Sequence, residues 1–104
     1  MEIERQETAN GSKYIVWNDY KSRIIGSATL SESSDPVELK KIDVKRNIRS
    51  NGIGSVLLKK ILEDFEDSEI VAKTFEARLE WYKRHGFEVE EYNDRVARVR
   101  KEPS

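Results

Sequence analysis

The chain of 104 residues contains no cysteine and a single histidine, His85. Without cysteine, the protein cannot form a disulfide, a cysteine-ligated zinc site or a covalent acyl-cysteine intermediate. One histidine alone makes a histidine metal cluster or a Ser-His-Asp triad improbable. We therefore expect no metal site, and any group transfer must proceed without a cysteine nucleophile.

The chain also lacks long apolar runs and an excess of positive charge. No apolar segment is long enough to cross a membrane and no signal peptide is recognisable, so cytoplasmic residence is the default expectation. The formal net charge is −1, and therefore no overall basic field favours nucleic acid as a partner. The length predicts a single domain over residues 1–104 with a modest core.

Short apolar segments separated by turns make up most of the chain. Strands are expected over residues 2–7, 14–17, 24–30, 37–44, 68–73, 87–89 and 96–99. Helices are expected over residues 53–65 and about 75–85, where apolar residues recur one turn apart. In the second helix this face would hold Phe75, Leu79 and Tyr82. The order predicts an α+β fold in which a sheet of about six to seven strands carries two main helices.

The fourth strand changes the phase of its apolar alternation. Val37 and Leu39 are apolar on odd positions, whereas Ile42 and Val44 are apolar on even positions. A β-bulge around residues 40–41 produces this change, because one extra residue turns every later side chain to the other face. The alternative is a strand with polar residues on both faces.

A glycine-containing basic loop leads directly into the first helix. Its sequence is Arg49-Ser50-Asn51-Gly52-Ile53-Gly54. The first turn of a helix has four backbone N–H groups without an intrahelical partner, and glycine lets a phosphate approach them closely. Arg49 adds a forked cationic donor. The loop lacks the remaining residues of a dinucleotide fingerprint and of a nucleotide P-loop, so it predicts a different pyrophosphate site.

The pattern Arg-x-x-Gly-x-Gly resembles the acyl-coenzyme A signature of the GNAT N-acetyltransferase superfamily. The segment 42–44 is similar to that family's strand before the loop, and residues 81–87 resemble its aromatic-Tyr-x-x-x-Gly-Phe ending. The motifs and the strand order cover roughly residues 22–100. This resemblance implies a mixed, mostly antiparallel sheet whose fourth and fifth strands splay apart at the bulge. The backbone groups freed there would accept the pantetheine arm like an added strand.

The resemblance also implies acetyl-CoA as co-substrate. The residues expected to hold it are Ile42, Asp43, Val44, Arg49, Ser50, Asn51, Gly52, Ile53, Gly54 and Ser55. The backbone N–H of Val44 would polarise the acetyl carbonyl, a role in which its side chain has no part.

Two side chains are candidates for the proton transfers. Tyr82 matches the tyrosine of the family motif, and a phenol with a pKa of about 10 can protonate a departing thiolate. The alternative for Tyr82 is a core tyrosine that packs on Leu79. Glu38 is the candidate general base, because it stands six residues before Val44, near the glutamate of some histone-acetylating members. The alternative for Glu38 is an ordinary surface glutamate of a strand.

The sequence departs from the family pattern in two places. Phe75 stands where the family usually has an asparagine that assists the pantetheine arm. The family also places two helices between its first two strands, whereas this chain has only residues 8–12 there. One wall of the acceptor site is therefore missing. Either an open groove accepts a bulky amine, such as a protein N-terminus or a lysine side chain, or a second subunit of a homodimer supplies the wall. The strand edges of the first hairpin slightly favour the dimer.

We accordingly predict an N-acetyltransferase that moves an acetyl group from acetyl-CoA directly to a primary amine in a ternary complex. The absence of cysteine independently favours direct transfer. One rival is a non-catalytic acyl-CoA-binding module that regulates a partner. Another is a small protein or nucleic-acid adaptor that uses a basic patch, although aromatic residues for base stacking are absent from it. That patch comprises Lys40, Lys41, Lys45, Arg46 and Arg49.

Overall fold

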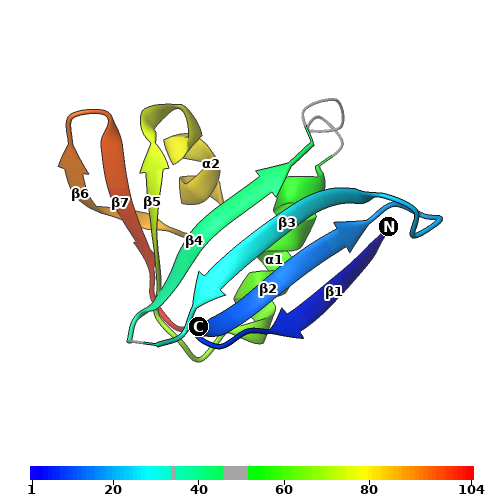
Figure 1. Cartoon of the computed structure of the whole chain (residues 1–104). Coiled ribbons are helices and arrows are strands. Elements are labelled where there is room, and N and C mark those ends of the chain that lie inside the picture. Colours follow the sequence, from blue (N-terminus) through cyan, green and yellow to red (C-terminus); the bar gives the residue numbers. More distant parts are fainter. Residues whose placement is uncertain (34, 46–51) are drawn as a thin grey trace.

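Seven strands form one mixed sheet in the computed structural model, which describes residues 1–33, 35–45 and 52–104. In chain order the elements are β1 (Glu2–Glu7), β2 (Gly11–Trp17), β3 (Ile24–Ser31), β4 (Val37–Val44), α1 (Ile53–Asp64), β5 (Ile70–Phe75), the 3-10 helix η2 (Glu76–Arg78), α2 (Leu79–Arg84), β6 (Glu88–Asn93) and β7 (Val96–Lys101). Across the sheet the strand order is β1-β2-β3-β4-β5-β7-β6. The predicted α+β class, with about seven strands and two main helices, is confirmed (Figure 1).

The sheet consists of two antiparallel parts joined by one short parallel pairing. Strands β1 to β4 pair antiparallel in sequence order, and β5, β7 and β6 form the second part. Between β4 and β5 the register covers only Val37–Leu39 against Ile70–Ala72. Beyond this point the two strands diverge, as Figure 1 shows, and the predicted splay is confirmed. The second half of β4 therefore presents an edge that β5 does not cover.

A bulge in β4 accounts for the change of apolar phase. Thr29 of β3 pairs with Lys41, whereas the next residue, Leu30, pairs with Leu39, so that Lys40 has no partner in the register. The extra residue keeps both Leu39 and Ile42 buried in the core. The bulge predicted around residues 40–41 is thereby confirmed.

Helix α1 covers one face of the first four strands (Figure 1). Its Leu57, Leu58 and Ile61 are fully buried, and they belong to the same core cluster as Tyr14 and Leu30 of the sheet. Burying each such aliphatic side chain contributes about 1.5–3 kcal/mol. This packing fixes α1 behind the sheet, with its N-terminus beside the end of β4 (Figure 1).

The second helix is shorter than predicted. Phe75 belongs to β5, where it pairs with Val96 of β7, and its side chain is 69% exposed. The prediction that Phe75 lies on a helical face with Leu79 and Tyr82 is therefore wrong, because only Leu79 and Tyr82 belong to α2. The backbone N–H of Glu76 also donates to the carbonyl of Arg95, which extends the sheet contact. Pairing with a strand some twenty residues later thus overrides the local helical pattern, and α2 begins only at Leu79.

Candidate active site

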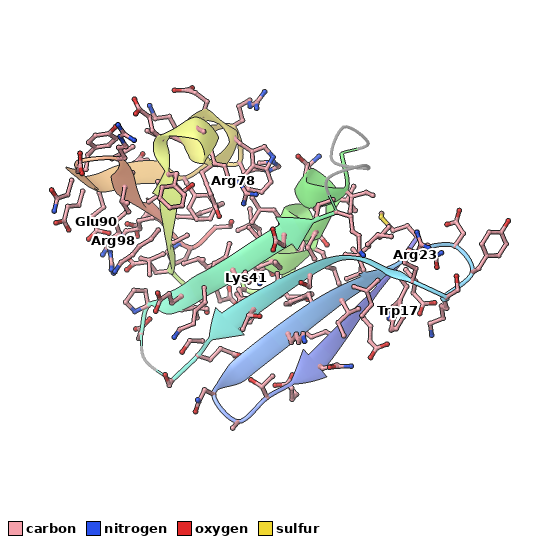
Figure 2. All side chains as sticks on the ribbon, turned by 45° about the horizontal axis from the view of Figure 1, so that its top comes forward. Trp17, Arg23, Lys41, Arg78, Glu90 and Arg98 are labelled. Atoms are coloured by element: carbon pink, nitrogen blue, oxygen red, sulfur yellow. The ribbon has the colours of Figure 1, made fainter. Side chains whose placement is uncertain are left out.

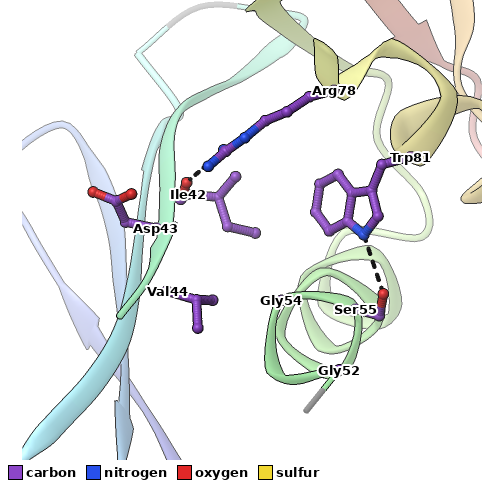
Figure 3. Close-up of a pocket in the computed structure, with 8 residues that line it drawn as sticks. All are labelled: Ile42, Asp43, Val44, Gly52, Gly54, Ser55, Arg78 and Trp81. Carbon is purple, nitrogen blue, oxygen red and sulfur yellow. Dashed lines mark hydrogen bonds between the residues drawn. The ribbon is translucent and has the colours of Figure 1, made fainter. Parts of the chain in front are cut away.

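A pocket of about 190 Å³ lies between the uncovered edge of β4, the first turn of α1 and the start of α2 (Figure 3). The residues that line it are Ile42, Asp43, Val44, Gly52, Gly54, Ser55, Arg78 and Trp81. Six of these eight were predicted to hold the cofactor. Three further predicted residues, Arg49, Ser50 and Asn51, lie outside the described residues.

One predicted residue, Ile53, points elsewhere. Its side chain is 8% exposed and belongs to the hydrophobic core, so only its backbone is available at the start of the helix.

Two glycines, Gly52 and Gly54, leave the start of α1 without side chains at these positions. Gly52, the N-cap residue, has φ +73° and ψ +13°, a left-handed conformation in which a side chain is strained. A Cβ added to Gly52 would meet no atom within 4 Å, and the first helical turn has no acidic residue. Since the N-terminus of a helix carries a partial positive charge, this opening suits an anion.

Gly54 leaves the passage between β4 and α2 open. A Cβ at this position would lie 3.5 Å from the Trp81 ring and 3.6 Å from the Val44 side chain. These are ordinary contact distances, so a methyl group would fit there but would fill the gap between the two walls. The glycine thus makes room for a ligand rather than relieving backbone strain.

The edge of β4 supplies backbone groups to the pocket. The N–H of Lys45 donates to the carbonyl of Ile25, at 3.0 Å, on the β3 side. Because successive residues of a strand point their backbone groups to opposite edges, those of Ile42 and Val44 point to the β5 side. The carbonyl of Ile42 accepts a hydrogen bond there from Arg78 Nη1 at 3.1 Å.

A hydrogen-bonded cluster connects α1 to α2 beside the pocket. Ser55 Oγ accepts a hydrogen bond from Trp81 Nε1, and His85 Nε2 lies at the same distance of 3.2 Å from it. Burial, together with the positive charges of Lys59 and Arg84, lowers the pKa of His85 below its ordinary value of 6.5. At neutral pH the imidazole is therefore uncharged.

Tyr82 lies next to the pocket wall and not in the pocket lining. It is 3% exposed, and its ring packs edge-on against Trp81 and Phe87, with ring centroids 5.0 and 5.2 Å away. Burial raises the pKa of the phenol, an effect that the charge of Arg78 partly offsets. Within the described parts of the chain, no hydrogen bond of this hydroxyl is seen.

Glu38 lies at the opposite end of β4 from the pocket. It pairs with Val71 of β5 at the point where the two strands are still joined, and it is half-buried. Its neighbours Val37 and Leu39 face the core, so Glu38 faces the other side of the sheet. Six residues of strand separate it from Val44, which corresponds to about 20 Å. The structure therefore does not bring Glu38 together with the predicted cofactor residues.

Arg78 lines the pocket, although the sequence did not single it out as a site residue. It stands at the end of η2, and its contact with Ile42 joins positions 36 residues apart. No local pattern marks such a residue, because its place depends on where β5 ends.

In residues 1–33, 35–45 and 52–104, no group of three or more His, Cys, Asp or Glu side chains could hold a metal ion. No helix in that part of the chain is long and apolar enough to cross a membrane.

Comparison with known proteins gives a family match and many similar folds. A family model described as Acetyltransferase (GNAT) domain matches residues 10–89. Comparison with curated protein sequences found no match.

Three solved structures illustrate the similarity of fold. A GNAT family acetyltransferase from Elizabethkingia anophelis with acetyl-CoA bound has a TM-score of 0.77 at 19% identity, covering 89% of this chain and 76% of that one. The PaiA N-acetyltransferase from Thermoplasma acidophilum in complex with coenzyme A has a TM-score of 0.72 at 22% identity, covering 86% and 59%. The IAA acetyltransferase from Bacillus cereus has a TM-score of 0.80 at 19% identity, covering 97% and 98%.

Proposed function

The chain belongs to the GNAT acetyltransferase family, and we propose on this basis that it transfers the acetyl group of acetyl-CoA directly to a primary amine. The observation that carries the proposal is the pocket between the uncovered edge of β4 and the open N-terminus of α1. Two similar folds hold acetyl-CoA or coenzyme A in their crystal structures, which supports this choice of co-substrate.

The pocket offers two complementary binding surfaces for acetyl-CoA. The edge of β4 at Ile42 can pair with an amide group of a pantetheine arm, as an added strand would, and Val44 remains a proposed ligand on the same strand. The first turn of α1, from Gly52 to Ser55, can receive the diphosphate on its N–H groups. Arg49, Ser50 and Asn51 remain proposed phosphate ligands of the preceding loop.

Bound acetyl-CoA supplies an activated acyl group with a thiolate leaving group. The amine first loses its ammonium proton to Glu38, through water. The amine nitrogen then attacks the carbonyl carbon, and the carbon–sulfur bond breaks. Tyr82 donates its hydroxyl proton to the departing sulfur, and the proton released by the new amide nitrogen restores the phenol. Direct transfer fits a chain without cysteine.

Tyr82 suits the role of general acid for two reasons. Its raised pKa keeps the phenol protonated at neutral pH, so that it has a proton to donate. Its ring contacts Trp81, which lines the pocket, and the structure shows no hydrogen bond of its hydroxyl to another described residue.

Glu38 can act as the base only if the acetyl group lies towards the end of β4 that still pairs with β5. An acetyl group polarised by the N–H of Val44 would lie too far away for a short proton relay, as the strand distance of about 20 Å implies. The N–H of Ile42 is on the same edge and two residues nearer, but about 13 Å of strand still separates it from Glu38, so the proton would have to pass along a chain of several waters. We therefore place the carbonyl at Ile42 when Glu38 serves as base.

Binding and turnover must be measured separately to test this function. Calorimetry with acetyl-CoA tests the pocket, and release of free thiol in the presence of a panel of peptides and small amines tests transfer. Tight binding together with amine-dependent thiol release is expected. Binding without turnover for any amine would identify a non-catalytic CoA-binding module, and no binding at all would contradict the proposal.

A further inference from the structure

Arg78 bridges the opening between the two parts of the sheet. Its side chain extends from the end of η2 towards β4, and Nη1 donates to the Ile42 carbonyl at 3.1 Å (Figures 2 and 3). This carbonyl lies on the edge of β4 beyond the last residue that pairs with β5. Arg78 thus occupies the position that a further strand would occupy.

Arg78 is also the only cationic side chain among the described residues that line the pocket. The one acidic lining residue, Asp43, does not neutralise it, because Asp43 pairs with Lys41 at 3.7 Å and points away from Arg78 (Figure 3). A guanidinium has five N–H donors, and among the described residues this one is engaged only with the Ile42 carbonyl. The remaining donors are available to an anion.

The position of Arg78 allows it to change partners. Arg78 is an exposed residue and no member of the hydrophobic core, so its stem can move without disturbing the core. Its guanidinium lines the same pocket as Gly52, Gly54 and Ser55, at the N-terminus of α1. A phosphate there would offer charged oxygens, which bind a guanidinium more strongly than a neutral carbonyl does.

We propose that Arg78 is a cofactor-binding residue that exchanges the Ile42 carbonyl for the diphosphate of acetyl-CoA. In the ligand-free protein it donates to the Ile42 carbonyl at the edge of β4. When acetyl-CoA binds, the pantetheine arm takes over the Ile42 carbonyl and the guanidinium moves to the phosphate oxygens. This inference rests on the proposed function, since it assumes that the pocket binds acetyl-CoA.

The exchange predicts opposite effects on two ligands. Replacing Arg78 by Met removes the charge and keeps a flexible stem of similar length. Loss of a charged hydrogen bond to phosphate should weaken coenzyme A binding by about 10- to 100-fold. Pantetheine lacks the diphosphate and only has to displace the guanidinium, so it should bind several-fold more tightly to Arg78→Met than to the wild type.

The experiment compares coenzyme A by calorimetry with pantetheine by amide chemical-shift titration, for wild type, Arg78→Met and Arg78→Lys. Arg95→Met is the matched control, because it removes one exposed arginine charge at the β6–β7 turn, away from the pocket lining. We expect Arg78→Lys to recover part of the coenzyme A affinity and Arg95→Met to resemble the wild type. Thermal unfolding without ligand confirms that each variant is folded.

Each other result contradicts the exchange. Tighter binding of both ligands to Arg78→Met would mean that Arg78 merely blocks the channel. Parallel weakening of both would mean that it only shapes the wall. If Arg78→Met bound coenzyme A as tightly as the wild type, Arg78 would not be a cofactor-binding residue, and the proposed function would be unaffected. A wild-type protein that binds neither ligand would overturn both proposals.

Discussion

The indole of Trp81 donates a hydrogen bond to Ser55 Oγ, 3.2 Å away, and so ties the wall of the pocket to the first turn of α1. His85, at the end of α2, lies within hydrogen-bond distance of the same oxygen through its Nε2. Because the serine oxygen accepts from the indole, its own O–H can donate to an unprotonated imidazole. A neutral His85 therefore completes this cluster, whereas a protonated one would place a second donor against a hydroxyl that must then turn away.

Stability should consequently fall in mild acid through His85. Its pKa in the folded state is lowered below 6.5, so the unfolded chain binds more protons below that pH and folding loses free energy as the pH falls. We expect the melting temperature of the wild type to drop more steeply between pH 7.5 and 5 than that of His85→Gln, which cannot titrate. Other groups titrate equally in both proteins, so parallel pH profiles would show that His85 is not the cause.

Gly52 provides a test of the anion site. In Gly52→Asp a carboxylate would lie at the helix N-terminus, where it would repel phosphate. Acetyl-CoA should raise the melting temperature of the wild type, because it binds only the folded state, and should not raise that of Gly52→Asp.

The matched control for this test is Gly52→Asn, which has the same shape without the charge and tolerates the left-handed conformation of Gly52. It should retain most of the thermal shift. An equal shift for the aspartate variant and the wild type would show that the diphosphate does not bind at this helix start.

Tyr82→Phe tests the general acid because it removes the proton and keeps the buried ring. Turnover should fall by about ten- to a thousand-fold with little change in coenzyme A affinity. Thiol release and calorimetry on the same preparation provide the two measurements. Tyr14→Phe is the control, since that tyrosine is also buried but donates to Asp64 outside the pocket. If Tyr82→Phe keeps full turnover, Tyr82 is only a core residue.

Local signals in the sequence were sufficient for most of the fold. The Asn10-Gly11 pair predicts the first hairpin, and the N–H of Thr8 indeed bonds to the carbonyl of Gly11 at 2.9 Å. The bulge at Lys40 could be predicted from the sequence, because one extra residue changes the alternation of apolar residues from odd positions before it to even positions after it. The hairpin and the bulge depend on residues that are neighbours in the sequence, and so does the glycine-containing start of α1.

What the sequence did not reveal depends on contacts between distant segments. Phe75 continues β5 because Val96 pairs with it, and this pairing decides where η2 and α2 begin. The position of Arg78 follows from that boundary, so its bond to Ile42 could not be inferred from local spacing. The opposite problem affects Glu38, whose spacing from Val44 matched a family pattern without revealing that the two lie at opposite ends of a strand.

The missing acceptor wall leads to a prediction about partners. Between β1 and β2 there is only a tight turn, and α1 covers one face of the first four strands, which leaves their other face uncovered (Figures 1 and 2). Gln6, Lys13, Thr29 and Lys41 form a cross-strand row on that uncovered face. Such a polar surface is compatible with water and needs no subunit to cover it.

The edge of the sheet is protected in a similar way. The outer strand β1 has the sequence Glu-Ile-Glu-Arg-Gln-Glu, and charged side chains on an edge strand discourage pairing with a second chain. These two features now favour an open groove over the homodimer. We therefore expect a monomer that acetylates peptide amines with a higher kcat/KM than small free amines, because a peptide can contact the uncovered surface on both sides of the reacting nitrogen.

Light scattering at micromolar concentration, followed by rates with a lysine-containing peptide and with a small alkylamine, tests both parts of this expectation. Lys41→Glu and Lys13→Glu reverse charges in the polar row and should change the KM for the peptide more than the KM for the alkylamine. A stable dimer would indicate that a second subunit supplies the missing wall. A monomer that acetylates the small amine as efficiently as the peptide would contradict the open-groove acceptor, because neither a partner nor the uncovered face would then be needed for recognition.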